Sequence, residues 1–142
     1  MKKILVINGP NLNMLGIREP DLYGKKDFKA LCQYIRDCAA ELGCDVELYQ
    51  SNHEGDIVTA IQQAYGTKDG IVINPAAYTH TSVAILDAVK ACGLPTVEVH
   101  LTNISTREEF RHISYVSAAC VARFLGLGFD GYKKALEYLC NN

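Results

Sequence analysis

Short apolar runs alternate along the chain with longer stretches whose apolar residues recur at helical spacing. The apolar runs, with one alternating segment, predict strands at 3–7, 45–50, 70–73 and 96–99. The helical spacing predicts helices at 28–42, 82–92 and 131–140, and one more that carries Ile57, Ile61 and Ala64. Residues 120–125 fit a strand or a helix, and we favour a strand because Gly126 and Gly128 follow directly.

Residues that favour helix ends lie near the same boundaries. The sequence Ser-Asn-His-Glu at 51–54 has capping-box spacing and predicts the start of the second helix there. Ser-Thr-Arg-Glu at 105–108 has the same spacing and predicts a short helix over 107–110. Gly43 and Gly93 follow two of the helices as stop signals.

The predicted order is β-α-β-α-β-α-β-(short α)-β-α. Such alternation is typical of a parallel sheet covered by helices on both faces. With five strands we expect a flavodoxin-like three-layer α/β sandwich with strand order 2-1-3-4-5. The chain shows no repeat, linker or low-complexity segment, so residues 1–142 are predicted to form a single domain.

Composition narrows the class of protein. The chain has 142 residues, 49% of them hydrophobic, and a formal net charge of −2, so it lacks the basic character of a nucleic-acid-binding protein. The N-terminal apolar run at 4–7 is too short for a secretory signal. No run approaches the ~20 apolar residues of a membrane span. We therefore expect a cytoplasmic protein with neither a nucleic-acid nor a membrane partner.

Six cysteines are present, without any Cys-x-x-Cys pair or Cys/His cluster at metal-ligand spacing. Most of them lie within apolar helical or strand patterns. Cysteines of this kind in a cytoplasmic chain behave as small buried hydrophobic residues. We therefore predict no structural disulfides and no metal site.

Polar side chains follow three of the predicted strands, and ligands of open α/β sheets bind beyond the carboxyl ends of such strands. The side chains are Asn11, Asn74, His80, Glu98 and His100. We expect them to converge on one hydrogen-bonding crevice. A phosphate cradle is not expected, because neither Gly-x-x-x-x-Gly-Lys-Ser/Thr nor Gly-x-Gly-x-x-Gly occurs.

The connection between the first strand and the first helix is long. It spans residues 9–24, whereas compact domains usually join such elements with about 2–6 residues. It carries Arg18 and Tyr23 near its end. Long connections of this kind are typically functional, and we expect this one to be a lid loop over the crevice.

Four segments read NGPNLNMLGIREPDLYG (8–24), NPAAYTHTS (74–82), EVHLTNISTREEFR (98–111) and GLGFDGY (126–132). They resemble the signature blocks of the type II 3-dehydroquinate dehydratases, and the likeness runs from about residue 4 to 139. The resemblance implies a flavodoxin-like fold, a homododecamer built as a tetramer of trimers, and no metal or cofactor. It also implies elimination of water from 3-dehydroquinate through an enolate to give 3-dehydroshikimate, a step of the shikimate pathway to chorismate and the aromatic amino acids.

The resemblance further implies the acid–base residues. Tyr23 would remove the proton beside the substrate ketone, with Arg18 favouring its phenolate. A phenol pKa of about 10 must fall by about 3 units, or about 4 kcal/mol, for this role. Asn11 would hold a water against the enolate oxygen. His100 would protonate the leaving hydroxyl, and Glu98 would orient its ring.

Substrate contacts are implied in the same way. Asn74, His80 and Arg111 match substrate-binding positions, and backbone donors at Leu101 and Thr102 suit the substrate carboxylate.

Asp87 matches a carboxylate that reaches the neighbouring subunit's site in the family's trimer. Arg107 is a weaker candidate, as a lid partner or subunit contact.

Alternatives stay open on the residues alone. A loop arginine or tyrosine is usually solvated, and a lone histidine after a buried strand is as often structural as catalytic. A lysine Schiff-base dehydratase is disfavoured, because 142 residues cannot form a barrel of about 250. A non-catalytic flavodoxin-like module that binds a small carboxylate would need neither Arg18 nor Tyr23. Arg123 departs from the family pattern, because it lies in a stretch that is usually more apolar.

Overall fold

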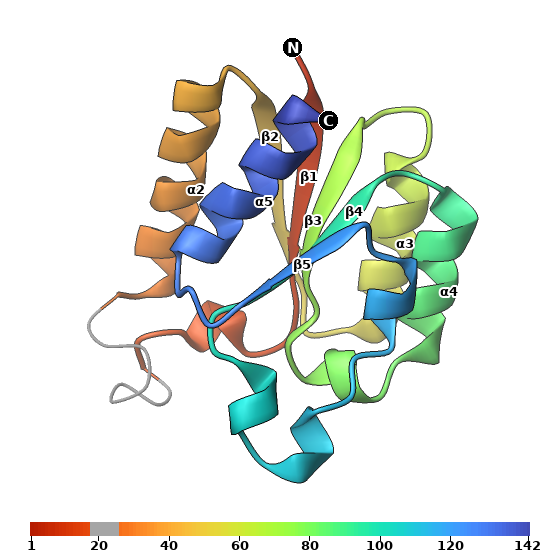
Figure 1. The fold of residues 1–142 in the computed structure, drawn as a ribbon. Helices are drawn as coiled ribbons and strands as arrows, with labels where there is room; N and C mark the ends of the chain where they lie inside the picture. The colour runs from red at the N-terminus through yellow and green to blue at the C-terminus, as the bar shows by residue number, and fades with distance from the viewer. Residues whose placement is uncertain (18–25) are drawn as a thin grey trace.

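The computed structural model describes residues 1–17 and 26–142, and its framework is a twisted sheet between two helical layers (Figure 1). Within these residues, five parallel strands follow the order β2-β1-β3-β4-β5, which confirms the predicted flavodoxin-like topology. The strands are β1 (Lys3–Asn8), β2 (Asp45–Gln50), β3 (Gly70–Asn74), β4 (Thr96–His100) and β5 (Ala122–Leu125). The helices are α2 (Phe28–Leu42), α3 (Glu54–Ala64), α4 (Val83–Cys92) and α5 (Asp130–Asn141).

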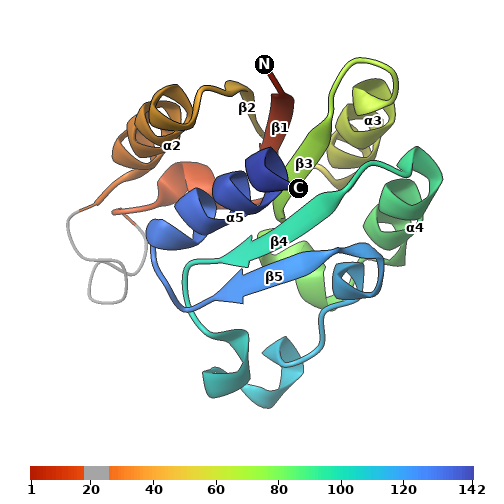
Figure 2. The ribbon, with the colours of Figure 1, turned by 45° about the horizontal axis from the view of Figure 1, so that its top comes forward.

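Two hydrophobic cores lie on opposite faces of the sheet. Helices α2 and α5 cover one face, and α3 and α4 cover the other (Figures 1 and 2). Strands β3 and β4 are buried along their whole length, which is why they read as continuous apolar runs. Strand β5 pairs with β4 from Val97↔Ala122 to His100↔Leu125, so the strand prediction for this stretch is confirmed.

The start of α3 differs from the prediction. The helix begins at Glu54 with His53 as its N-cap, and the Ser51–Glu54 capping box does not form. The Ser51 N–H donates instead to the Asn8 carbonyl at 3.1 Å, which extends the β1–β2 ladder by one residue. The Ser51 hydroxyl accepts from the His53 N–H at 2.9 Å and closes a turn before the helix.

The second predicted capping box is also wrong. Residues 107–110 do not form a helix, and two short 3-10 turns, Ile104–Thr106 and Glu109–Arg111, take its place. Asn103 caps the first turn, because its Oδ1 accepts from the Ser105 N–H at 3.0 Å. The Glu108 carboxylate turns forward to Arg111 rather than back to a helix start.

The first part of the long 9–24 connection is anchored in the core. Residues 12–14 form a 3-10 turn, and the side chains of Leu12 and Leu15 are buried in the cluster that α2 also covers. Movement of this part would expose two leucines, so residues 12–15 are expected to stay in place.

The cysteines occupy positions of small hydrophobic residues. All six are free thiols; Cys38, Cys44 and Cys92 are buried, and the other three are partly buried.

Gly9 lies where the chain leaving β1 meets the chain leaving β3. A Cβ at this position would lie 2.5 Å from the Pro75 carbonyl oxygen. We expect Gly9→Ala to lower the free energy of unfolding by about 1–3 kcal/mol, because backbone must shift to admit the methyl group. Gly55→Ala is the matched control, since nothing lies within 4 Å of its Cβ position, and the change favours the α3 helix. Denaturant unfolding measures both, and equal stability of the two variants would contradict the clash.

Candidate active site

A pocket opens beyond the carboxyl ends of β1, β3 and β4, at the reversal of strand order. Seven of the residues predicted from the sequence line it: Asn11, Asn74, His80, His100, Leu101, Thr102 and Arg111. The remaining lining residues are Pro10, Leu12, Ala76, Ala77, Ile104 and Arg107. The structure therefore brings most of the predicted side chains to one place, as the topology required.

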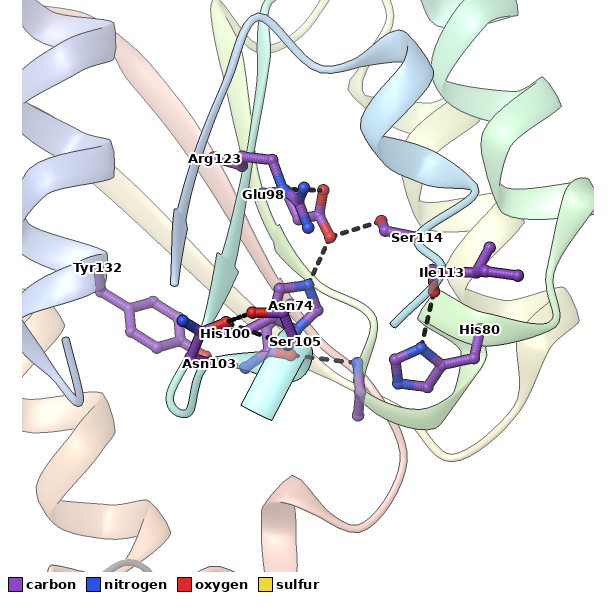
Figure 3. Close-up of polar contacts among 11 residues, drawn as sticks. Asn74, His80, Glu98, His100, Asn103, Ser105, Ile113, Ser114, Arg123 and Tyr132 are labelled. Carbon is purple, nitrogen blue, oxygen red and sulfur yellow. Dashed lines mark hydrogen bonds and ion pairs between the residues drawn. The ribbon is translucent and has the colours of Figure 1, made fainter. Parts of the chain in front are cut away.

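Asn74 is held by a buried relay of side chains (Figure 3). The Tyr132 hydroxyl, from α5, donates to Asn8 Oδ1 at 2.6 Å and accepts from Asn74 Nδ2 at 3.0 Å. Asn74 Oδ1 accepts from the Ala76 N–H at 3.1 Å. These contacts fix the orientation of the Asn74 amide and leave its second N–H for a ligand.

The role of Tyr132 in this relay was not predicted from the sequence. Its place on the apolar face of the last helix made it look like a core residue only. The available signal was indirect: Asn8 and Asn74 both end buried strands, so each needs a buried partner. A tyrosine on the helix that covers them supplies one through its hydroxyl.

His100 and Glu98 form a buried pair at the end of β4. The Nε2 of His100 lies 2.5 Å from Glu98 Oε2, which also accepts from the Ser114 hydroxyl at 2.6 Å (Figure 3). Burial raises the pKa of Glu98, but the hydrogen bonds from His100 and Ser114 outweigh it and hold this pKa below its usual value. The carboxylate is therefore ionised, and the Nδ1 of His100 is the nitrogen left for proton transfer.

His80 lies on the 3-10 turn Ala76–His80 after β3. Its Nδ1–H donates to the Ile113 carbonyl at 2.8 Å (Figure 3). Burial lowers the pKa of this imidazole, against the opposing effect of that hydrogen bond. A neutral ring with Nδ1 engaged offers Nε2 as an acceptor for a ligand hydroxyl.

Asn11 lies at the mouth of the pocket in the left-handed conformation, with φ of 68°. Asparagine is one of the few residues that adopt it readily. Its backbone N–H donates to Asn52 Oδ1 at 3.0 Å, and its side chain makes no capping hydrogen bond. The structure thus gives the Asn11 amide no loop-capping role.

Two arginines, Arg107 and Arg111, line the pocket and both pair with Glu108. Glu108 Oε2 accepts from the Nε of Arg111 at 3.1 Å, and Oε1 pairs with the Nε of Arg107 at 3.8 Å. A hydrogen bond from its own backbone and one from Arg111 lower the pKa of Glu108. Arg107, only a weak candidate from the sequence, lines the pocket just as Arg111 does.

Four predicted residues do not line this pocket. Glu98 is fully buried and acts on the pocket only through its contact with His100. Asp87 is exposed on α4 and does not belong to the lining of the chain's own pocket. Arg18 and Tyr23 lie outside the described residues.

The assembled groups suit a small oxygenated anion. The two guanidinium groups make the pocket favourable for an anion, the amides and His80 can bind hydroxyls, and the His100–Glu98 pair can move a proton. Within residues 1–17 and 26–142, no three His, Cys, Asp or Glu side chains group as a metal site. In the same part of the chain, no helix is long and apolar enough to cross a bilayer.

Fold and site together define a flavodoxin-like α/β protein whose switch-point pocket is built for acid–base chemistry on a small polar molecule. Residues 2–140 match the family described as Dehydroquinase class II. The chain belongs to this family, and the resemblance noted in its four sequence blocks is confirmed.

Individual relatives agree over nearly the full length. A 3-dehydroquinate dehydratase of Clostridium acetobutylicum is 52% identical over 139 residues, covering 98% of this chain and 96% of the relative. One from Clostridium perfringens is 55% identical over 141 residues, covering 99% and 97%. The crystal structure of the type II dehydroquinase from Butyrivibrio crossotus has a TM-score of 0.96 at 49% identity, covering 99% of this chain and 98% of that one.

The Tyr132 relay is testable through stability. We expect Tyr132→Phe to lower the free energy of unfolding by about 1–3 kcal/mol, because Asn8 and Asn74 each lose a buried partner. Tyr65→Phe is the matched control, since Tyr65 is 73% exposed and its hydroxyl faces water. Denaturant unfolding compares the two, and equal midpoints would show that the relay adds no stability.

Proposed function

We propose that this chain catalyses the dehydration of 3-dehydroquinate to 3-dehydroshikimate in the shikimate pathway, through an enolate and without metal or cofactor. The observation that carries the proposal is the His100–Glu98 pair at the head of an amide- and arginine-lined pocket, in a member of the class II dehydroquinase family. The family and its named relatives supply the substrate.

Proton removal is the first step. Tyr23, as phenolate, takes the proton from the carbon beside the ketone, and the electron pair moves onto the ketone oxygen. Arg18 lies five residues earlier, and its cation favours the phenolate. Asn11, free of a capping role, holds the water that hydrogen-bonds the enolate oxygen.

Loss of hydroxide completes the reaction. The enolate reforms the ketone, the carbon–hydroxyl bond breaks, and His100 donates its Nδ1 proton so that water leaves. The Glu98 carboxylate supports this by orienting the ring through Nε2 and stabilising its protonated form. Asn74, His80 and Arg111 bind the substrate hydroxyls.

The substrate carboxylate binds at the backbone of Leu101 and Thr102, which both line the pocket. The chain acts as one catalytic domain, with a lid in residues 9–24; the first part of this connection is anchored in the core by Leu12 and Leu15.

We further propose that the protein works as a homododecamer, a tetramer of trimers, in the cytoplasm. The free thiols are consistent with a reducing compartment. The exposed position of Asp87, outside its own pocket, is consistent with a role in the neighbouring subunit's site.

An ultraviolet assay tests the reaction. With 3-dehydroquinate and a chelator present, we expect rapid absorbance from the conjugated enone product. Tyr23→Phe and His100→Gln are expected to lower kcat by about 10²-fold or more, because each removes one proton-transfer group. Tyr65→Phe, at an exposed site, serves as the control and keeps full activity.

Other results of these experiments would favour a different function or a different base. No product from a folded oligomer would favour the non-catalytic carboxylate-binding module. Full activity in Tyr23→Phe would keep the reaction and remove Tyr23 as its base. Inactivation by borohydride only with substrate present would indicate a lysine Schiff base, although no lysine of the described residues lines the pocket.

Subunit complementation tests Asp87. We expect Asp87→Asn to lower kcat, because a neighbouring site loses a carboxylate, while Asp37→Asn, an exposed acid on α2, has no effect. Co-expression of Asp87→Asn with His100→Gln subunits is expected to restore part of the activity, since a mixed trimer contains sites with both groups intact. No recovery in mixed oligomers would place the role of Asp87 within its own subunit.

A further inference from the structure

We propose that Arg123 is a positioning residue that acts on His100 through Glu98: its permanent cation holds the buried Glu98 carboxylate in the ionised state that the acid step needs. This inference rests on the proposed function, because it assigns a role within the same reaction. No contact with substrate is implied for Arg123.

The register of the sheet places the two residues together. Glu98 on β4 is paired directly with Arg123 on β5, so their side chains stand on the same face. The Nε of Arg123 lies 3.6 Å from Glu98 Oε1 (Figure 3). That distance is long for a hydrogen bond, so the contact is an ion pair.

The two carboxylate oxygens have different surroundings. Oε2 accepts from both His100 and Ser114. Oε1 is buried and has no hydrogen-bond partner among the described residues. Arg123 therefore stands on the side of the carboxylate that is otherwise uncompensated.

Burial makes this compensation necessary. The Glu98 side chain is 0% exposed, and a carboxylate removed from water is unstable unless charges and donors oppose the loss of hydration. Burial raises the pKa of Glu98, and Arg123 joins His100 and Ser114 in lowering it.

Arg123 differs from those partners in being charged at every stage. His100 loses its positive charge when it protonates the leaving hydroxyl, whereas a guanidinium stays protonated. Arg123 thus keeps the carboxylate ionised in both halves of the cycle. Its own side chain is 40% exposed, so its head group is hydrated and its removal need not disturb the core.

Other titratable groups near Glu98 do not duplicate this function. Cys120, which precedes β5, has its pKa raised to about 12 by burial and by the Glu98 charge, so it remains a neutral thiol. His80 faces the same region from the turn after β3, and burial lowers its pKa, so it is neutral near pH 7. Among the described residues in contact with Glu98, Arg123 is the permanent cation.

A charge-matched pair of variants tests the inference. For Arg123→Gln we expect kcat to fall about three- to tenfold near neutral pH. The acid limb of its pH profile should move upward by about half to one unit, with KM within about twofold. Arg123→Lys keeps the cation and is expected to restore most of kcat and the original profile. Arg36→Gln, which removes an exposed arginine from α2, is the control for loss of a positive charge.

A second measurement needs no turnover. The pH titration of the Glu98 carboxyl signal, followed by NMR with labelled glutamate, should move to higher pH in Arg123→Gln and return in Arg123→Lys. Unchanged kcat profile and unchanged titration in Arg123→Gln would overturn the inference, as would equal losses in both variants. A protein without dehydratase activity whose titration still moves would instead overturn the proposed function and leave the ion pair's effect established.

Discussion

Buried polar groups at the ends of the parallel strands impose the main constraint on this fold. Asn8, Asn74 and Glu98 are each at most 3% exposed. A polar group removed from water is costly unless another protein group pairs with it. Tyr132 from α5 and His100 from β4 provide these partners. The contacts that make burial tolerable also orient the side chains that face the pocket, so stability and preorganisation share one source.

The two buried arrangements differ in kind. The relay of Tyr132 with Asn8 and Asn74 joins uncharged hydrogen-bonding groups. The pair of Glu98 and His100 depends on which member carries charge, so neighbouring charges affect it directly. Amides fixed in this way suit the recognition of hydroxyls, whereas a charge-tunable imidazole suits proton transfer. An uncharged relay therefore holds the amide that is suited to binding, whereas a charge-dependent pair holds the imidazole that is suited to proton transfer.

The pattern of apolar residues predicted the strands and helices, because the burial of each element determines its local composition. Strands β3 and β4 are buried on both faces and must be apolar, and the helices between them require parallel pairing. The two predicted capping boxes did not form, and the role of Tyr132 was not predicted, for the same reason. In each case, tertiary contacts determine which groups hydrogen-bond to one another. The Ser51 N–H instead donates in the β1–β2 ladder. Asn103, rather than Ser105, caps the 3-10 turn that follows β4. Such choices become visible only when the sheet register is known.

In the proposed mechanism, the acid and the base belong to different parts of the chain. His100 ends the inner strand β4, and the residues that support it come from β4, β5 and the segment before β5. Tyr23 and Arg18 belong to the connection that follows the core anchor at Leu15. In that mechanism, an acid held by the core and a base on a separate segment would let the substrate bind before proton removal begins. Because the Glu98 carboxylate beside His100 is buried, nearby charges as well as geometry determine the properties of this pair.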